Sequence, residues 1–288
     1  MGLSITKKPV EVIYPDDWTL PVIFSSPHSG DHYPDSFVQQ TDLDLLSLRQ
    51  SEDFKVDELI GMAPGLGAPL VKSNYPRAFC DPNRQAYELD PSMFDEDLPE
   101  HVTTSSHRIA AGIGTIPKIV SAGKQIHTSL LSYQDALERL MLCYFPYHAA
   151  LKETIEEGVE KFGKILLVDC HSMPGSPANI SEKSKLTDFI LGDRFGDSCP
   201  LEYSIFIANR LKSYGYSVCY NSPYAGGYIT QHYSSHYKDV NVLQIEINRL
   251  LYMDQSTLTP TEGMSVLKDQ FSELISDLGT ILNFKKAG

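Results

Sequence analysis

The sequence predicts an α/β protein, a three-layer sandwich around a mixed but mostly parallel sheet. Two observations indicate this class. Apolar, strand-like runs alternate with amphipathic helical stretches along most of the 288 residues. The run Ile165–Val168 is continuously aliphatic, which is typical of a parallel strand buried on both faces. No internal repeat or linker interrupts the pattern, so we expect one domain over residues 1–288.

Short apolar runs followed by turn residues predict the strands, which we place at residues 9–14, 21–26, 69–72, 165–168, 189–192, 216–220 and 240–247. Two of these runs end alike. Residues 21–30 read PVIFSSPHSG and residues 164–174 read KILLVDCHSMP, so His28 and His171 each follow a strand. Because ligands bind beyond the carboxyl ends of strands in open α/β sheets, we expect both histidines at one shared site.

Helical periodicity predicts helices at residues 42–61, 133–162, 201–214 and 263–284. Pro146 lies inside the second stretch and cannot donate to the helix ladder, so we expect a bend there. Gly163 then ends this helix. Residues 86–128 combine weak periodicity with many turn residues, which predicts a loop-rich excursion. Residues 221–232, around YAGGYITQH, are expected to form another loop.

Charge and cysteine content exclude several classes of protein. The net charge of −13 argues against a nucleic-acid partner, which needs clustered Lys and Arg. No apolar run approaches the roughly 18 residues of a membrane span, so we expect no membrane partner. Five widely spaced cysteines without a C-x-x-C motif argue against disulfides and a thiolate zinc site, and favour the cytoplasm. An acidic substrate would need local arginines to reverse the repulsive field.

The histidine pair suggests a hydrolytic metal site. Zinc in hydrolases usually takes three His or carboxylate ligands and keeps one position open. His28 and His171 supply two ligands. The third should be a carboxylate or another histidine from a nearby segment, and the carboxylate candidates are Glu52, Asp53 and Asp31.

Glu246 is the other unusual residue, because it lies between two isoleucines in an apolar strand. A carboxylate there is costly unless it is paired or used. It faces outward, pairs with Arg249 or Arg77, or serves as general base and then general acid beside a zinc water. Asp169 is two residues before His171, and we expect it to orient a histidine rather than to bind the metal.

Five segments resemble one family, the N-formylglutamate amidohydrolases, also called N-formylglutamate deformylases. The matching segments, in the family's order, are PHSGDHYP at 27–34, SEDFKVDEL at 51–59, GAPLVKSNYPRAFCDPNR at 67–84, LLVDCHSMP at 166–174 and GGYITQHYSSHYKDVNVLQIEINRLLYM at 226–253. The family is similar in fold to zinc carboxypeptidases and related exopeptidases. The resemblance therefore implies a zinc-exopeptidase-like (phosphorylase/hydrolase-like) sandwich that is a single catalytic domain.

The resemblance also implies a reaction, the hydrolysis of N-formyl-L-glutamate to formate and L-glutamate in histidine degradation. It implies one divalent metal ion, expected to be Zn²⁺, held by His28, Asp53 and His171. Asp53 is preferred to Glu52 because an Asp before an aromatic residue resembles the family's Asp-Trp. Glu246 matches the catalytic glutamate of the carboxypeptidase-like fold.

Polar residues of the matching loops are expected to bind the substrate. Arg77 and Arg84, in NYPR and DPNR, resemble the groups that receive substrate carboxylates, a task suited to bidentate guanidinium pairing. Arg77 is also a candidate donor to the oxyanion. Arg108, Asn83 and His232 complete the expected substrate-binding set.

Two other functions remain open at this stage. One is a zinc deacylase or carboxypeptidase that acts on another N-acyl amino acid or a small peptide. The other is a non-catalytic ligand-binding protein of the same fold. In every case the expected partner is a small anionic molecule, and the protein is expected to be a monomer or a small homo-oligomer.

Overall fold

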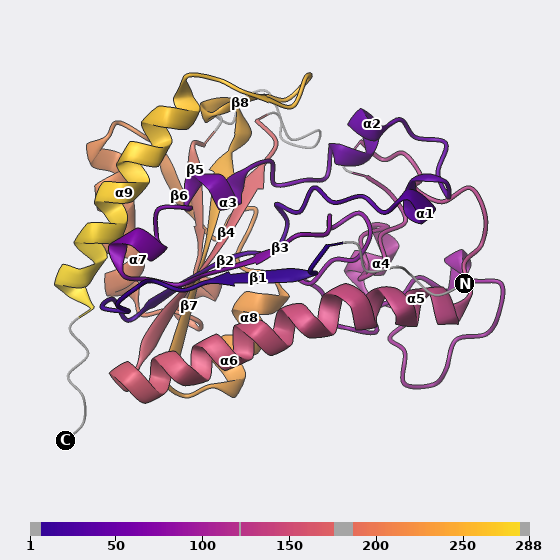
Figure 1. Cartoon of the computed structure of the whole chain (residues 1–288), viewed down its shortest axis with the longest axis horizontal. Coiled ribbons are helices and arrows are strands. Elements are labelled where there is room, and N and C mark those ends of the chain that lie inside the picture. Colours follow the sequence, from indigo (N-terminus) through magenta and orange to yellow (C-terminus); the bar gives the residue numbers. More distant parts are fainter. Residues whose placement is uncertain (1–6, 121, 176–186, 283–288) are drawn as a thin grey trace. The chain divides into compact units, whose positions relative to one another are not determined.

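The computed structural model describes residues 7–120, 122–175 and 187–282. Seven strands form one sheet with the order β1-β3-β2-β4-β7-β5-β6 (Figure 1). Its strands are β1 Val10–Ile13, β2 Val22–Ser26, β3 Leu70–Ser73, β4 Ile165–Met173, β5 Phe189–Gly192, β6 Val218–Tyr220 and β7 Val240–Asn248. Strands β8 (Met253–Asp254) and β9 (Thr259–Pro260) form a separate antiparallel pair.

The pairing of the strands confirms the predicted α/β class. Strands β2 and β4, β4 and β7, and β5 and β6 pair in parallel, whereas β5 runs antiparallel to β7. The sheet is therefore mixed but mostly parallel. Ser25 of β2 pairs with Asp169 of β4, and His171 of β4 pairs with Glu246 of β7. This register sets polar side chains side by side on adjacent strands.

The helices are α1 Asp35–Val38, α2 Leu45–Arg49, α3 Val56–Leu59, α4 His107–Ala110, α5 Tyr133–Arg139, α6 Phe145–Phe162, α7 Leu201–Ser213, α8 Tyr228–His236 and α9 Gly263–Ile281. Single 3-10 turns are η1 Pro64–Leu66, η2 Pro91–Met93, η4 Arg194–Gly196 and η5 Arg249–Leu251, and η3 Leu140–Tyr144 is a π-helical segment. None of the helices in the described ranges is long and apolar enough to cross a membrane.

By their contacts the residues group into two compact units. Unit 1 comprises Met1–Glu11, Pro27–Glu52 and Lys72–Ala150, and unit 2 comprises Val12–Ser26, Asp53–Val71 and Leu151–Gly288. Unit 1 contains the loop-rich stretch 86–128, whose described residues form short turns such as η2 and α4. Unit 2 contains β2, β4, β5, β6 and β7 with the helices that cover them.

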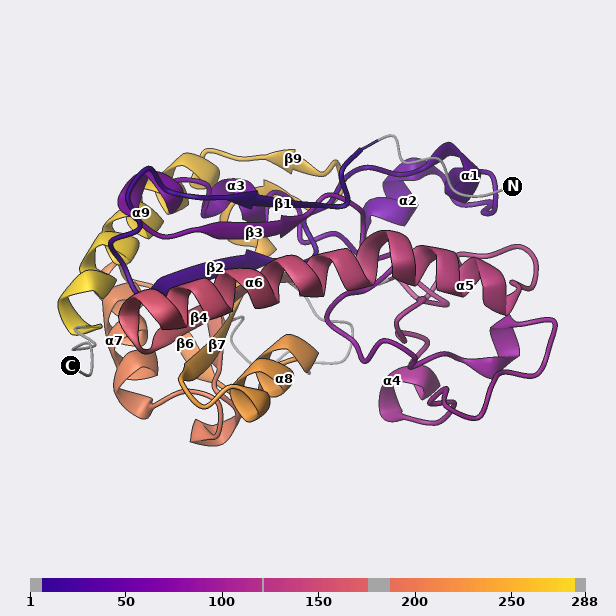
Figure 2. The same cartoon turned by 60° about the horizontal axis from the view of Figure 1, so that its bottom comes forward.

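The core of unit 2 explains how the central strands are held. Apolar side chains of β2, β4, β5 and β7 form one buried cluster with those of α3, α7 and α9. Figure 1 shows α9 along one side of these strands, and Figure 2 shows α8 beside β7. Phe271, Leu274 and Leu278 of α9 are almost fully buried in this cluster. Each such side chain contributes about 1.5–3 kcal/mol through burial.

The structure corrects the prediction of a helix over residues 42–61. Only α2 and α3 are helical within it, and the chain turns between them. Lys55 has a left-handed backbone with φ of 54°, which breaks the helical path. Glu52 and Asp53 are buried in this turn.

The other helices follow the prediction, with differences at their ends. The predicted 133–162 helix consists of α5, the π-helical η3 and α6, and the π segment ends at Tyr144, two residues before Pro146, which cannot donate to the ladder. Gly163 has the expected positive φ of 80°. Helix α8 begins inside the loop predicted at 221–232, with Gly227 as its N-cap. The predicted end of the last helix, residues 283–284, lies outside the described residues.

Candidate functional site

His171 lies inside strand β4, not beyond its end as the sequence predicted. Strand β4 continues to Met173 because β7, its parallel neighbour, pairs with it through Asn248. The polar run after Val168 therefore remains extended and buried. His171 and Glu246 occupy paired positions on these strands, so the predicted histidine and the predicted base are brought together within unit 2.

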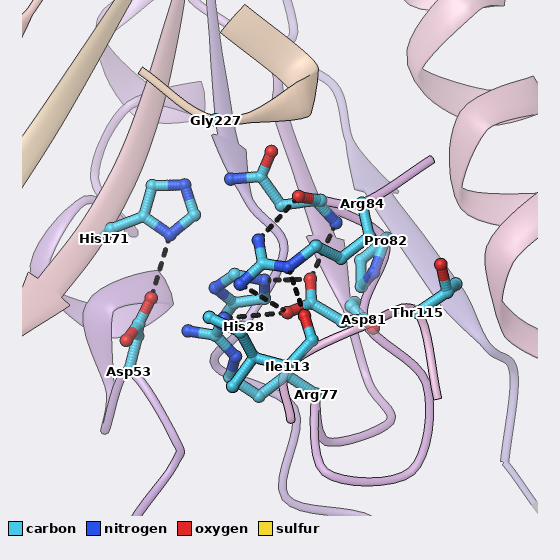
Figure 3. Close-up of polar contacts among 12 residues, drawn as sticks. His28, Asp53, Arg77, Asp81, Pro82, Arg84, Ile113, Thr115, His171 and Gly227 are labelled. Carbon is cyan, nitrogen blue, oxygen red and sulfur yellow. Dashed lines mark hydrogen bonds and ion pairs between the residues drawn. The ribbon is translucent and has the colours of Figure 1, made fainter. Parts of the chain in front are cut away.

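The imidazole of His171 lies between two carboxylates. Its Nδ1 is 2.9 Å from Oδ2 of Asp53, as Figure 3 shows, and its Nε2 is 2.9 Å from Oδ2 of Asp169. Asp169 also accepts a 2.9 Å hydrogen bond from the hydroxyl of Ser25. All four side chains are buried. The contact expected between Asp169 and a histidine is present, and it fixes the ring plane.

Charge around His171 shifts its proton affinity. Burial lowers the pKa of the imidazole, but the charge and hydrogen bond of Asp169, the hydrogen bond of Asp53 and the charge of Glu246 all raise it. The balance places the pKa of His171 well above its ordinary value. Three carboxylates thus favour a positive charge at this point of unit 2.

Asp53 is held by groups on its other side. Its Oδ1 lies 3.3 Å from Nη2 of Arg249 and 3.3 Å from the hydroxyl of Ser172, and both groups donate to it. Arg249 also donates from Nε to the Ser172 hydroxyl at 3.0 Å. These contacts engage Oδ1 and turn Oδ2 toward His171. Arg249 therefore pairs with Asp53, a partner that the sequence did not indicate.

The two alternative carboxylates have other partners. The carboxylate of Glu52 accepts the Tyr33 hydroxyl at 2.7 Å and the Arg49 guanidinium at 2.9 and 3.0 Å. Burial raises the pKa of Glu52, and the Arg49 and Tyr33 hydrogen bonds oppose that rise. Asp31 is exposed and lies 3.4 Å from Lys7. Glu52 and Asp31 therefore each have ion-pair partners other than His171.

His28 belongs to a polar cluster in unit 1 that is centred on Asp81 (Figure 3). Nε2 of His28 is 2.7 Å from Oδ1 of Asp81, which also accepts the Asn83 backbone N–H at 2.8 Å. Oδ2 of Asp81 accepts from Nη2 of Arg77 at 2.7 Å and lies 3.5 Å from Nη2 of Arg84. Burial raises the pKa of Asp81, but the charges of Arg77, Arg84 and His28 place it well below its ordinary value.

The His28 loop is compact because the chain passes very close to a neighbouring segment. A Cβ at Gly30 would lie 2.2 Å from the carbonyl oxygen of Tyr75, so only glycine fits there. His32 donates its backbone N–H to the carbonyl of Asn74 at 3.1 Å. The Pro27–Gly30 segment is therefore fixed against the segment that leads to Asp81.

Three guanidinium groups gather in unit 1, as the charge argument required. Nε and Nη1 of Arg84 donate to the carbonyls of Ile113 and Asn83, both at 2.7 Å. Burial lowers the pKa of Arg84 to about 10, with Asp81 opposing and Arg77 and Arg108 adding to the effect. Arg108 lies 3.5 Å from Glu88. Their predicted contacts with substrate, like those of Asn83, stay predictions.

His232 lies on α8, in unit 2. Its ring stacks on Tyr228 with centroids 5.1 Å apart, and Tyr228 Oη lies 3.3 Å from its Nδ1. Burial and the neighbouring His236 both lower its pKa. The substrate contact predicted for His232 also stays a prediction.

Sequence reasoning missed two polar residues of these clusters. Asp81 was not among the expected site residues, but it is buried and contacts His28. Gln244 looked like a member of an apolar strand, but its amide contacts Glu246 at 2.8 Å. A signal existed for the second residue, because positions 244 and 246 share one face of a strand.

Comparisons with known proteins agree on one family. The sequence model of the N-formylglutamate amidohydrolase family matches residues 20–253. N-formylglutamate deformylase of Pseudomonas putida is 29% identical over 244 residues, covering 82% of this chain and 83% of that protein. Its counterpart from Pseudomonas aeruginosa is 27% identical over 239 residues, with the same coverage. The crystal structure of N-formylglutamate amidohydrolase from Ralstonia eutropha JMP134 superposes with a TM-score of 0.90 at 31% identity, over 96% of this chain and 99% of that one.

Proposed function

Since the chain belongs to the N-formylglutamate amidohydrolase family, we propose that it hydrolyses N-formyl-L-glutamate to formate and L-glutamate. The observation that carries this proposal is the buried group of His171, Asp53 and Glu246 in a chain that matches the family over residues 20–253. Two relatives that share this reaction name support the choice of substrate. The proposal includes one catalytic domain, a cytoplasmic location and a role in histidine degradation. Five free cysteines are consistent with that location.

We propose that His28, Asp53 and His171 bind one divalent metal ion, with zinc as the expected metal. Among the described residues, these three buried side chains form a group of the kind that holds a metal ion. Imidazole nitrogen and carboxylate oxygen are common zinc ligands. Asp169 at Nε2 of His171 and Asp81 at Nε2 of His28 would each leave Nδ1 as the ligand atom.

The charges around His171 also suit a bound metal ion. Asp53, Asp169 and Glu246 surround His171 with negative charge, and Arg249 offsets part of it at Asp53. Buried charges are costly unless they are paired or bind metal. A bound divalent ion supplies Lewis-acid polarisation of the formyl carbonyl and lowers the pKa of water at the site.

Within this reaction Glu246 moves the proton. Its carboxylate takes a proton from water as the water oxygen attacks the formyl carbon. The C–N bond then breaks, and Glu246 gives the proton to the amine nitrogen of the departing glutamate. Arg77 is the proposed donor to the oxyanion. Arg84 and Arg108 are proposed to attract the two substrate carboxylates, and Asn83 and His232 to contact the substrate.

A panel of substrates tests this assignment against a deacylase of wider range. We expect hydrolysis of N-formyl-L-glutamate with a kcat/KM at least about tenfold above that for N-formyl-L-leucine, which lacks the side-chain carboxylate that the arginines are proposed to attract. We expect the same margin over N-acetyl-L-glutamate, because its methyl group adds bulk at the carbonyl carbon that water attacks. Higher activity on the acetyl compound or on a dipeptide would favour the deacylase or carboxypeptidase. Binding of N-formyl-L-glutamate without turnover would favour a binding protein.

Replacing Asp81 by Asn tests how His28 is oriented. The amide keeps the shape of the side chain but removes the charge that His28, Arg77 and Arg84 share. Loss of a carboxylate that orients a metal-binding histidine typically costs about 10- to 100-fold in metal affinity. We expect a loss of this size in the zinc dissociation constant, measured by competition with a chromophoric chelator.

The matched control is Asp97→Asn, the same charge change at an exposed residue of unit 1. It should leave zinc affinity unchanged. An Asp81→Asn protein that is folded by circular dichroism and binds zinc as tightly as the control would contradict the role of Asp81.

A further inference from the structure

Gln244 connects the proposed general base to the start of helix α8. Its side chain is buried in β7, and its Nε2 donates to Oε1 of Glu246 at 2.8 Å. Its Oε1 accepts the backbone N–H of Gly227 at 2.7 Å and lies 3.4 Å from the Thr230 hydroxyl. The side-chain amide of Gln244 therefore connects β7 with the start of α8 in unit 2.

The backbone partner fixes which way this amide points. The N–H of Gly227 can only donate, so the group facing it must be the carbonyl oxygen of Gln244. The NH₂ group must then face Glu246. Since NH₂ can only donate, Oε1 of Glu246 accepts, and the contact holds the carboxylate in one orientation.

The segment that fixes the amide is itself tightly placed on the sheet. Gly227 is the N-cap of α8 and has no side chain of its own to cap the helix. A Cβ at Gly192, at the end of β5, would lie 2.9 Å from the backbone of Ala225 and of Gly226. Gly226 has a φ of 126°, which favours glycine. The close approach holds Gly227 where the amide of Gln244 can meet it.

We propose that Gln244 is a positioning residue that orients the carboxylate of Glu246 for proton transfer, with the first turn of α8 as its anchor. This inference rests on the proposed function, in which Glu246 is the base. Because Gln244 contacts the base, loss of its amide should slow the chemical step more than it weakens substrate binding.

Gln244→Met tests the kinetic part. Methionine keeps the length of the side chain but cannot donate to Glu246. We expect kcat for formate release to fall about 10- to 100-fold, since a small misplacement of a reacting group costs this much. KM should change less than about threefold and zinc content should not change. Gln231→Met, on the exposed face of α8, is the matched control and should behave like the native chain.

An exchange of the two side chains tests the contact without using turnover. Gln244→Glu alone opposes two carboxylates and should lower the melting temperature of the metal-free protein. The double variant Gln244→Glu, Glu246→Gln restores a donor and an acceptor in the reverse order. It should recover most of the lost melting temperature and remain inactive, because the carboxylate is at the wrong position.

Two results would overturn the proposal. One is a Gln244→Met protein with kcat within twofold of the native value, or with a loss confined to KM. The other is a double variant no more stable than Gln244→Glu. A native chain that released no formate would instead refute the proposed function, and the exchange would still test the contact.

Discussion

Replacement of Glu246 by Gln is expected to lower kcat for formate release about 10³-fold. The amide has nearly the same shape but cannot take a proton from water, and general base catalysis typically contributes about 10²- to 10⁴-fold. Glu246 is not one of the proposed metal ligands, so zinc content and affinity for N-formyl-L-glutamate should stay close to native. On one preparation, stopped assays of formate measure kcat, zinc analysis measures the metal content, and ligand titration measures the affinity for N-formyl-L-glutamate.

The control for this variant is Glu100→Gln, the same change at an exposed position. It should retain native activity. A Glu246→Gln enzyme that kept more than about a tenth of native kcat would show that another group moves the proton.

Replacement of His171 by Ala is expected to remove both metal and turnover. The ring is the centre of the polar cluster of unit 2, with Asp53 at Nδ1 and Asp169 at Nε2. Loss of even an orienting partner costs about 10- to 100-fold in affinity, so loss of a ligand should weaken zinc binding more than about 100-fold. Residual formate release should then be below about 1% of native. Zinc analysis after gel filtration and a formate assay with added zinc check this result.

His107→Ala, at an exposed histidine on α4, is the matched control and should keep zinc and activity. The metal-free His171→Ala protein must also show native circular dichroism. A folded His171→Ala chain that retained one zinc ion would exclude His171 as a ligand.

Short-range patterns predicted much of the fold. Mostly apolar runs marked β2, β4 and β7, because strands buried on both faces have few polar residues. The predicted end of strand β4 was wrong because it relied on the same apolar pattern, which stops before the strand does. The polar run after Val168 looked like a loop, yet it stays extended because its partners, Asp53 and Glu246, lie elsewhere in the sequence.

The residues of the candidate site were also predicted only in part from the sequence. The sequence selected His171 because it follows a strand-like run, as His28 does, and Glu246 because a carboxylate between two isoleucines is costly without a purpose. The contacts of Asp81 and Arg249 join residues far apart in the chain, such as Arg249 with Asp53. The amino-acid composition and the spacing of apolar residues carry no information on contacts between residues far apart in the chain. Such contacts are seen only in the structure.

The proposed zinc-dependent hydrolysis is tested most directly by the zinc content of the purified native chain, measured beside its release of formate from N-formyl-L-glutamate before and after chelation. We expect about one zinc ion per chain, formate and glutamate in equal amounts, loss of activity on chelation and its return with zinc. A chain that binds zinc but releases no formate would refute the substrate. Full turnover by a chain without bound metal would contradict the role of His28, Asp53 and His171.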